Sequence, residues 1–257
     1  MSIVTIDGRA LEIRTIDACA ADHPTLVFLH EGIGSISLWR DFPDRLAAAT
    51  GFGALVYSRY GYGQSAVLAE PRAADYMHRE ALDVLPAILQ TVGIDRHMLV
   101  GHSDGASIAL IYAGAAARPG LEGVLLEAPH VFVEPMNIKA IAATRETFMS
   151  TDLASRLARH HRDPSKTFYG WNDVWLSPAF RDWNIESHLA GIAVRVLAMQ
   201  GIDDEYGTMT QLDRIMARVP DCRELRIPRC GHSPHRDQPE VVLAAMTEFI
   251  AALLRKR

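Results

Sequence analysis

A five-residue segment, Gly101-His102-Ser103-Asp104-Gly105, places the tightest constraint on how this chain can fold. It follows the apolar residues 98–100 and precedes a run of helical character, residues 106–117. A serine with glycines two positions before and after it is typical of a sharp turn from a strand into a helix, which lifts the serine hydroxyl clear of the backbone. Glycine is expected where neighbouring main-chain segments leave no room for a Cβ atom. This context indicates a nucleophilic serine at position 103.

Short apolar runs alternate with longer helical patterns along the rest of the chain. The predicted strands cover residues 11–16, 25–30, 54–59, 98–102, 123–127, 194–200 and 223–227. The predicted helices cover residues 39–49, 76–92, 106–117, 208–219 and 239–254. This alternation predicts an α/β protein with a mostly parallel, doubly wound sheet and helices on both faces.

The alternation breaks between residues 132 and 189, a stretch of helical character rich in aromatic and basic residues. Its three tryptophans, Trp171, Trp175 and Trp183, exceed what ordinary packing needs. We predict that residues 132–189 form a helical cap inserted into a core of residues 1–131 and 190–257. Its aromatic side chains are expected to line a pocket over the carboxyl edge of the sheet. In the alternative interpretation they belong to two or three ordinary core helices.

The composition narrows the class of protein. The 257 residues are 49% hydrophobic and 22% charged, and a chain of this length buries about three quarters of its unfolded surface without help from disulfides or metals. The net charge of −5 gives no reason to expect nucleic acid or an anionic membrane as partner. Three cysteines and no signal-peptide pattern favour a reducing compartment. We therefore expect a cytoplasmic protein with a small-molecule substrate, and a homodimer is left open.

A serine nucleophile needs a base, and the base needs a group that orients it. Two acids, Asp203 and Asp204, follow the penultimate predicted strand, and two histidines, His232 and His235, follow the last one. The carboxyl ends of the strands border the ligand crevice in an open parallel sheet. Both kinds of candidate are therefore expected to meet Ser103 at this edge.

The chain resembles the α/β-hydrolase fold superfamily over nearly its whole length. The resemblance rests on the elbow around Ser103 and on four further motifs in the order of that superfamily: residues 30–35, 59–65, 201–204 and 231–232. It implies a serine hydrolase that works through a covalent acyl-enzyme and needs no metal or organic cofactor.

The same resemblance assigns roles to individual residues. Ser103 is the nucleophile. His232, which directly follows a glycine, is the general base, and Asp204, three residues after a glycine, is the acid that orients it. Asp203 and His235 remain alternatives for the acid and the base.

The resemblance also implies that the backbone N–H groups of Gly32 and Asp104 hold the oxyanion, with Ile33 next to them. The chain departs from the family at Glu31, where glycine is usual, and this leaves the second donor open. A carboxylate facing an oxyanion costs about 1 kcal/mol or more. We expect the two acidic side chains to point away or to meet a cation. Alternatively, one of them receives a substrate amine, as in α-amino-acid ester hydrolases. The predicted substrate pocket is lined by Glu31, Ile33, Phe132 and the three tryptophans.

The sequence thus predicts a hydrolase of a small carboxylic ester, thioester or lactone. Alternatives on the same fold are a hydrolase of C–C bonds in ring-cleavage products, an amino-acid ester hydrolase, and a ligand receptor without efficient turnover. His160 and His161 lack a third ligand at suitable spacing, so no metal site is expected.

Overall fold

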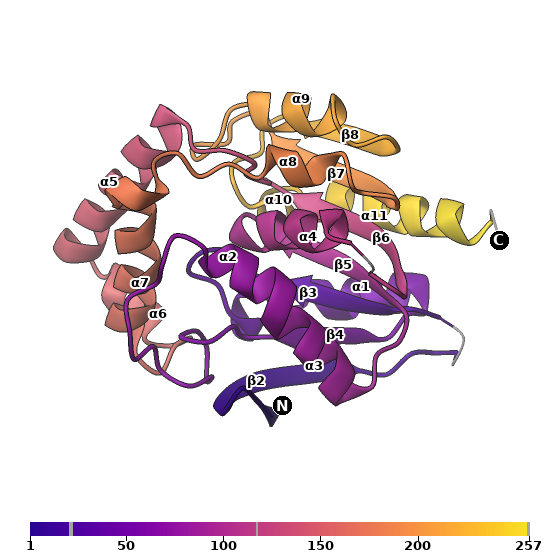
Figure 1. Ribbon diagram of the computed structural model, residues 1–257, viewed down its shortest axis with the longest axis horizontal. Helices are drawn as coiled ribbons and strands as arrows, with labels where there is room; N and C mark the ends of the chain where they lie inside the picture. The colour runs from indigo at the N-terminus through magenta and orange to yellow at the C-terminus, as the bar shows by residue number, and fades with distance from the viewer. Residues whose placement is uncertain (21–22, 117, 256–257) are drawn as a thin grey trace.

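An eight-stranded sheet forms the centre of the described part of the chain (Figure 1). The computed structural model describes residues 1–20, 23–116 and 118–255. The strand order is β1-β2-β4-β3-β5-β6-β7-β8. The pairs β1–β2 and β2–β4 are antiparallel and all other pairs are parallel. The strands are β1 (Ser2–Ile6), β2 (Arg9–Ile16), β3 (Thr25–Leu29), β4 (Ala54–Tyr57), β5 (His97–His102), β6 (Leu121–Glu127), β7 (Arg195–Gly201) and β8 (Cys222–Ile227).

The predicted mostly parallel α/β sheet is confirmed, and the burial of its central strands agrees with helices on both faces. Strands β4 and β5 are buried at every residue, as expected for strands that carry helices on both faces. Each predicted strand occurs with bounds shifted by no more than two residues. Strand β1 was not predicted. It pairs with β2 through a tight turn in which Asp7 and Gly8 both have positive φ.

Helices cover both faces of the sheet. On one face, α1 (Phe42–Thr50) packs against α11 (Pro239–Leu254). The other face carries α2 (Tyr76–Arg79), α3 (Leu85–Val92), α4 (Asp104–Gly114) and α9 (Thr210–Met216). A π-helical turn, η2 (Glu80–Val84), joins α2 to α3. Pro86 cannot donate an N–H to the carbonyl of Leu82 there, so the predicted helix 76–92 is irregular. The predicted end of helix 106–117 at Ala117 lies outside the described residues.

The segment between β6 and β7 is helical. It contains α5 (Pro135–Ser150), α6 (Leu153–Leu157), α7 (Pro164–Leu176), the 3₁₀ turn η3 (Pro178–Phe180) and α8 (Glu186–Leu189). Helices α5, α6 and α7 contact one another at one end of the sheet, and we call them the cap helices (Figure 1). Helix α8 instead packs on α4 and α9. A cap with the bounds 132–189 remains a prediction.

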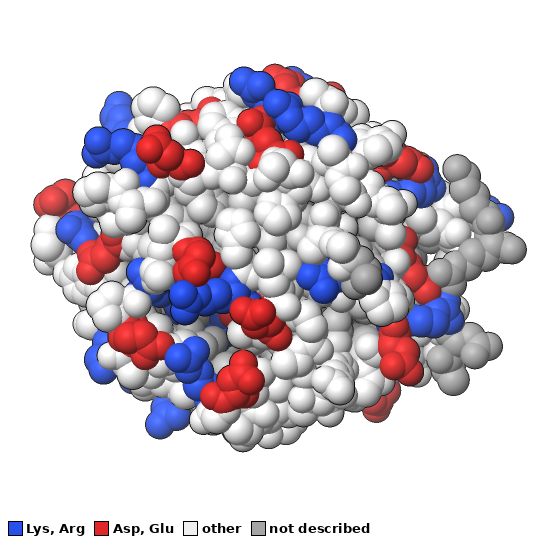
Figure 2. Space-filling model, in the orientation of Figure 1, with Lys and Arg blue, Asp and Glu red and all other residues white. Residues whose placement is uncertain are grey.

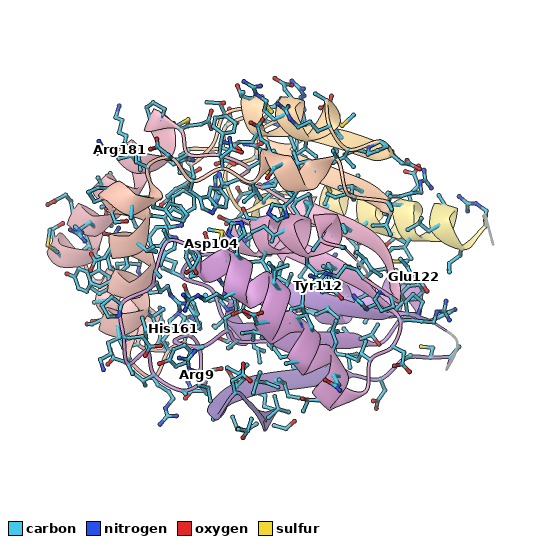
Figure 3. The ribbon with its side chains drawn as sticks, in the orientation of Figure 1. Arg9, Asp104, Tyr112, Glu122, His161 and Arg181 are labelled. Atoms are coloured by element: carbon cyan, nitrogen blue, oxygen red, sulfur yellow. The ribbon has the colours of Figure 1, made fainter. Side chains whose placement is uncertain are left out.

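The end of the sheet next to the cap helices is also the end at which α4 begins. Figure 3 shows Asp104, the first residue of α4, toward the cap helices, and Tyr112, near the other end of α4, away from them. On the face in Figure 2, basic and acidic side chains are interspersed. Within the described residues, no helix is both long and apolar enough to cross a membrane.

Candidate active site

Ser103 occupies a strained turn between β5 and α4. Its backbone angles are φ 54° and ψ −117°, a combination that costs an L-residue about 1–3 kcal/mol. A Cβ atom on Gly101 would clash with the backbone of Gly105, and one on Gly105 would clash with the carbonyl of Leu29. Both glycines are therefore required on steric grounds, and the turn places the buried Ser103 at the wall of a cavity.

Three side chains from distant loops form one hydrogen-bonded row. The Oγ of Ser103 lies 2.9 Å from Nε2 of His232, and Nδ1 of the same imidazole lies 2.8 Å from Oδ1 of Asp204. An imidazole with its proton on Nδ1 donates to the carboxylate and leaves Nε2 free to accept from the serine hydroxyl. The structure thus brings together the three residues predicted for catalysis, in the order that proton transfer needs.

The carboxylate of Asp204 is buried and fully engaged. Its Oδ1 also accepts from the backbone N–H of Tyr206 at 2.8 Å, and its Oδ2 accepts from Nε2 of Gln200 at 3.2 Å. Burial acts to raise the pKa of this carboxyl, but the charge and hydrogen bond of His232 hold the pKa below its ordinary value. Asp204 therefore stays ionised and fixes the orientation of the imidazole.

The structure places the two alternative residues elsewhere. Asp203 is exposed, whereas Asp204 is buried. His235 is buried and its Nδ1 lies 3.0 Å from Oε2 of Glu127, which also accepts from the His235 backbone N–H at 2.7 Å. Neither residue belongs to the hydrogen-bonded row of Ser103. Among the candidates, the row thus favours Asp204 and His232.

The two predicted oxyanion donors border the same cavity as Ser103. Gly32 lies in the loop after β3, and Asp104 directly follows the nucleophile. In the described part of the chain, no acceptor takes the backbone N–H of either residue. Gly32 also faces the indole of Trp171 so closely that a Cβ atom would overlap it. Glycine at position 32 thus lets the cap approach the loop while its N–H stays free.

A buried arginine connects these two segments. The Nη2 of Arg59 donates to the carbonyls of His30 at 3.1 Å and Glu31 at 2.9 Å, and lies 3.8 Å from Oδ2 of Asp104. The Asp104 oxygens also accept from the hydroxyl of Tyr76 at 2.6 Å and from Nε1 of Trp175 at 3.2 Å. Burial raises the pKa of Asp104, although Arg59 opposes this. Both carboxylate oxygens are therefore occupied within the protein.

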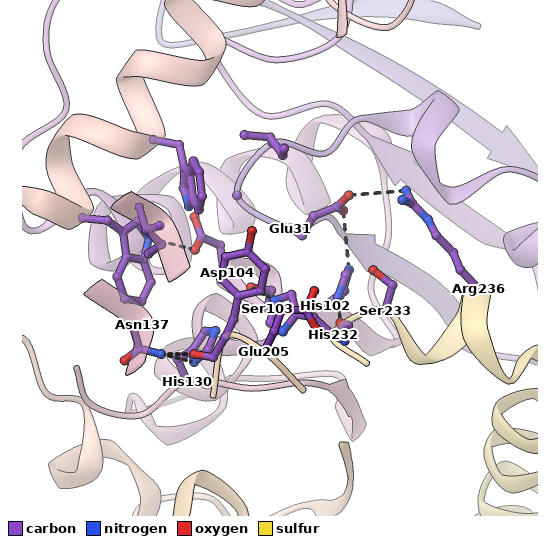
Figure 4. A pocket seen from close by; sticks show the side chains of 16 residues that line it. Glu31, His102, Ser103, Asp104, His130, Asn137, Glu205, His232, Ser233 and Arg236 are labelled. Atoms are coloured by element: carbon purple, nitrogen blue, oxygen red, sulfur yellow. Dashed lines mark hydrogen bonds and ion pairs between the residues drawn. The ribbon is translucent and has the colours of Figure 1, made fainter. Parts of the chain in front are cut away.

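Glu31 also meets cations, as Figure 4 shows. Its Oε2 lies 3.6 Å from Nδ1 of His102, and its Oε1 lies 3.5 Å from Nη2 of Arg236. Burial acts to raise the pKa of Glu31, but His102 and Arg236 hold it well below its ordinary value. Burial acts to lower the pKa of His102, and Glu31 more than reverses this. The acidic side chain is thus neutralised beside the predicted oxyanion site, as expected from the sequence.

A cavity of about 170 Å³ opens at Ser103. Glu31 and Ile33 from the loop after β3 and Trp171 and Trp175 from α7 line it, as predicted. The pocket prediction also included Phe132 and Trp183, but the structure places both outside the lining of this cavity. Phe132 forms a β-bridge with Asn184. Trp183 stacks on Phe180 and packs against Trp175 behind the cavity wall.

Sequence reasoning missed His130, Asn137 and Tyr206, which also line the cavity. The ring of His130 stacks on His232 at a centroid distance of 5.5 Å and an angle of 24°. Burial lowers the pKa of His130 to about 3, so its imidazole is neutral. His130 follows β6, and the rule that ligands bind at the carboxyl ends of parallel strands would have pointed to it.

The histidine pair of the cap segment has structural partners. Nδ1 of His160 lies 2.8 Å from Oγ of Ser37, and Nδ1 of His161 accepts from the backbone N–H of Gly63 at 2.9 Å. Within residues 1–20, 23–116 and 118–255, no three His, Cys, Asp or Glu side chains are placed to hold a metal ion.

Comparison with known proteins identifies the family. The model of the "Alpha/beta hydrolase family" matches residues 26–245. The chain belongs to this family. An esterase from Exiguobacterium antarcticum, also of this fold, superposes with a TM-score of 0.76 at 18% identity, over 97% of this chain and 99% of that one. Membership of this family identifies the protein as a hydrolase enzyme.

Two curated relatives show how widely such sequences differ in named activity. The 2-succinyl-6-hydroxy-2,4-cyclohexadiene-1-carboxylate synthase of Serratia proteamaculans is 24% identical, over 93% of this α/β hydrolase and 98% of the relative. A proline iminopeptidase of Levilactobacillus brevis is 23% identical over 88% of each chain. The family is therefore established, whereas the substrate has to be argued from the site.

Proposed function

We propose that this hydrolase cleaves a small carboxylic ester, thioester or lactone, with Ser103 as nucleophile, His232 as general base and Asp204 as the orienting acid. The row from Ser103 Oγ through the imidazole of His232 to Asp204 Oδ1, with contacts of 2.9 and 2.8 Å, is the observation that carries this proposal. The neighbouring structural relatives include esterases, which supports the choice of an ester.

The reaction proceeds in two halves. Nε2 of His232 takes the proton of Ser103 as Oγ attacks the substrate carbonyl, and the oxyanion is held by the N–H groups of Gly32 and Asp104. His232 then gives this proton to the leaving oxygen or sulfur as the carbonyl–heteroatom bond breaks. In the second half, His232 takes a proton from water while the hydroxide attacks the acyl-enzyme. The same proton returns to Ser103 as the acid is released.

The two carboxylates beside the predicted oxyanion site are not free to receive a substrate amine. A carboxylate that binds an ammonium group needs free acceptor positions. Both oxygens of Asp104 already accept hydrogen bonds, and Glu31 pairs with His102 and Arg236. Although proline iminopeptidases are among the relatives, the engagement of Asp104 and Glu31 within the protein favours an uncharged ester over a substrate with a free amine at the reacting end.

Covalent labelling tests the proposal. A fluorophosphonate should phosphonylate Ser103, which mass spectrometry of the digested protein locates. Labelling should be lost in Ser103→Ala and kept in Ser37→Ala, an exposed serine outside the hydrogen-bonded row. The labelled protein should no longer hydrolyse p-nitrophenyl acetate. An unlabelled Ser103, or full activity in Ser103→Ala, would refute the proposal. Labelling without ester turnover, but with turnover of a vinylogous diketone, would favour C–C bond hydrolysis instead.

A further inference from the structure

A second hollow lies next to the catalytic cavity, along α5. Its volume is about 430 Å³. It shares two lining residues, Glu205 and Tyr206, with the cavity at Ser103. The remaining lining residues all come from α5: Met136, Lys139, Ala140, Ala143, Thr144 and Thr147. We call this hollow the α5 groove. The cavity and the α5 groove are therefore adjacent spaces with one common wall.

Tyr206 is the side chain between them. Its ring packs on the imidazole of His232 at a centroid distance of 4.7 Å, and its hydroxyl lies 2.6 Å from Oγ1 of Thr144. The Thr144 hydroxyl also bonds the carbonyl of Ala140 at 2.9 Å, which uses its only hydrogen. The Tyr206 hydroxyl must therefore donate to Thr144. This hydrogen bond joins the loop after β7 to the cap helix α5.

The backbone of Tyr206 is held independently of its side chain. Its N–H donates to Asp204 at 2.8 Å, and its carbonyl accepts from the side chain of Asn137. Because these bonds fix the main chain, the ring can rotate out of the wall without displacing the catalytic acid. The bond to Thr144 is the hydrogen bond that holds the ring in place.

The α5 groove suits a hydrocarbon chain. The half-buried Met136 and Ala140 give it an apolar floor, whereas Ala143 and the charged side chains of Lys139 and Glu205 are exposed. The stretch of helix from Met136 to Thr147 is about 16 Å long at 1.5 Å per residue. An acyl chain attached to Ser103 that outgrows the cavity would enter this groove once the ring of Tyr206 moves aside.

We propose that the α5 groove binds the distal part of medium-length acyl chains and that Tyr206, fastened to Thr144, is the specificity-determining residue that limits access to it. This inference rests on the proposed ester hydrolysis and adds the acyl-chain length that the enzyme accepts. While the ring of Tyr206 stays bonded to Thr144, the enzyme favours short acyl groups, and longer chains reach the α5 groove only when that ring moves aside.

The experiment compares kcat/KM for p-nitrophenyl acetate, butyrate, octanoate and decanoate. In Tyr206→Ala, the ratio of octanoate to acetate activity should rise at least tenfold. Tyr206→Phe and Thr144→Val remove the hydrogen bond and keep the bulk, so each should raise the ratio by a smaller factor. In the double variant Tyr206→Phe/Thr144→Val, the ratio of octanoate to acetate activity should not exceed that of either single variant, because both changes remove the same hydrogen bond.

Filling the groove provides the matched control. Ala143→Trp should cancel the gain in the Tyr206→Ala background, since Ala143 lines the groove. Ala142→Trp is the control, because Ala142 is exposed, like Ala143, but does not line the groove, and it should leave the gain intact. If Tyr206→Ala does not fold, the ratios in Tyr206→Phe and Thr144→Val decide the matter.

Two failures are distinguishable. An unchanged chain-length ratio in folded variants that still hydrolyse acetate, or equal effects of tryptophan at both alanine positions, would overturn the role of the groove and leave the proposed function standing. A parent protein that hydrolyses none of the esters and takes no fluorophosphonate would overturn both.

Discussion

Replacement of Asp204 by asparagine removes one charge from the catalytic row and leaves its shape. An asparagine that keeps its oxygen toward His232 and Tyr206 faces Gln200 with its amide nitrogen and loses one hydrogen bond. The flipped amide would lose two. The first orientation is therefore favoured, and Nδ1 of His232 still has an acceptor. What the variant loses is the negative charge that stabilises the imidazolium formed when Ser103 attacks.

The distance sets the size of the effect. Two unit charges 2.8 Å apart attract by about 6 kcal/mol at an effective dielectric constant of about 20. This upper bound corresponds to about four powers of ten in rate. We therefore expect Asp204→Asn to lower kcat for p-nitrophenyl acetate by about 10³- to 10⁴-fold, with little change in KM. The rates are measured at pH 7.5, and the initial burst of p-nitrophenol gives the concentration of active sites.

Asp203→Asn is the matched control. It removes the same charge from the adjacent, exposed position of the same loop, and kcat should change less than about twofold. Retention of more than a tenth of the activity by Asp204→Asn would refute the reasoning, as would an equal loss in Asp203→Asn.

Three further predictions concern the surrounding residues. His235→Gln should lower the free energy of unfolding in urea by about 3 kcal/mol, because Glu127 loses a buried partner, while kcat stays within tenfold; a catalytic loss at full stability would contradict this. Burial lowers the pKa of His97 to about 4, so only the unfolded chain binds its proton as the pH falls from 7.5 to 5, and the protein loses stability. His97→Phe should reduce that loss by about 2 kcal/mol, and unaltered pH dependence would count against it. Asp104→Asn should change kcat/KM for alanyl and acetyl esters by one common factor. A selective loss on alanyl esters would instead show that Asp104 recognises a substrate amine.

The elbow and the sheet could be predicted because their signals are local. Ser103 and its two glycines form a turn whose sterics depend on a few adjacent residues, and buried parallel strands appear as short apolar runs. Strand β1 also carried a local signal, since Asp7-Gly8 is a typical hairpin turn between β-branched runs. Its exposed edge position hid it from a search for buried strands.

The pairing of Glu31 with His102 could not be predicted. The residues lie far apart in the sequence and meet because β3 and β5 are neighbours, with Leu29 opposite Gly101. Strand order of this kind follows from the packing of the whole chain. The cap aromatics show an intermediate case. Trp171 and Trp175 are four residues apart on one helix and share a face, whereas Trp183 lies beyond the end of α7.

The contacts of the Arg59 guanidinium separate the residues that stabilise the oxyanion from those that select the substrate. It ties the loop after β3 to the start of α4 from beneath, using only residues of the sheet region. The helices α5 and α7 that shape the space above Ser103 supply none of these ties. Trp175 of α7 donates to Asp104, Trp171 of α7 packs on Gly32, and Asn137 of α5 donates to the carbonyl of Tyr206. Mutagenesis libraries in α5 and α7 that keep these three residues therefore vary what enters the cavity while the groups that stabilise charge stay unchanged. Arg59→Lys replaces a planar guanidinium with a single ammonium group. This variant should lower kcat/KM by the same factor for every substrate.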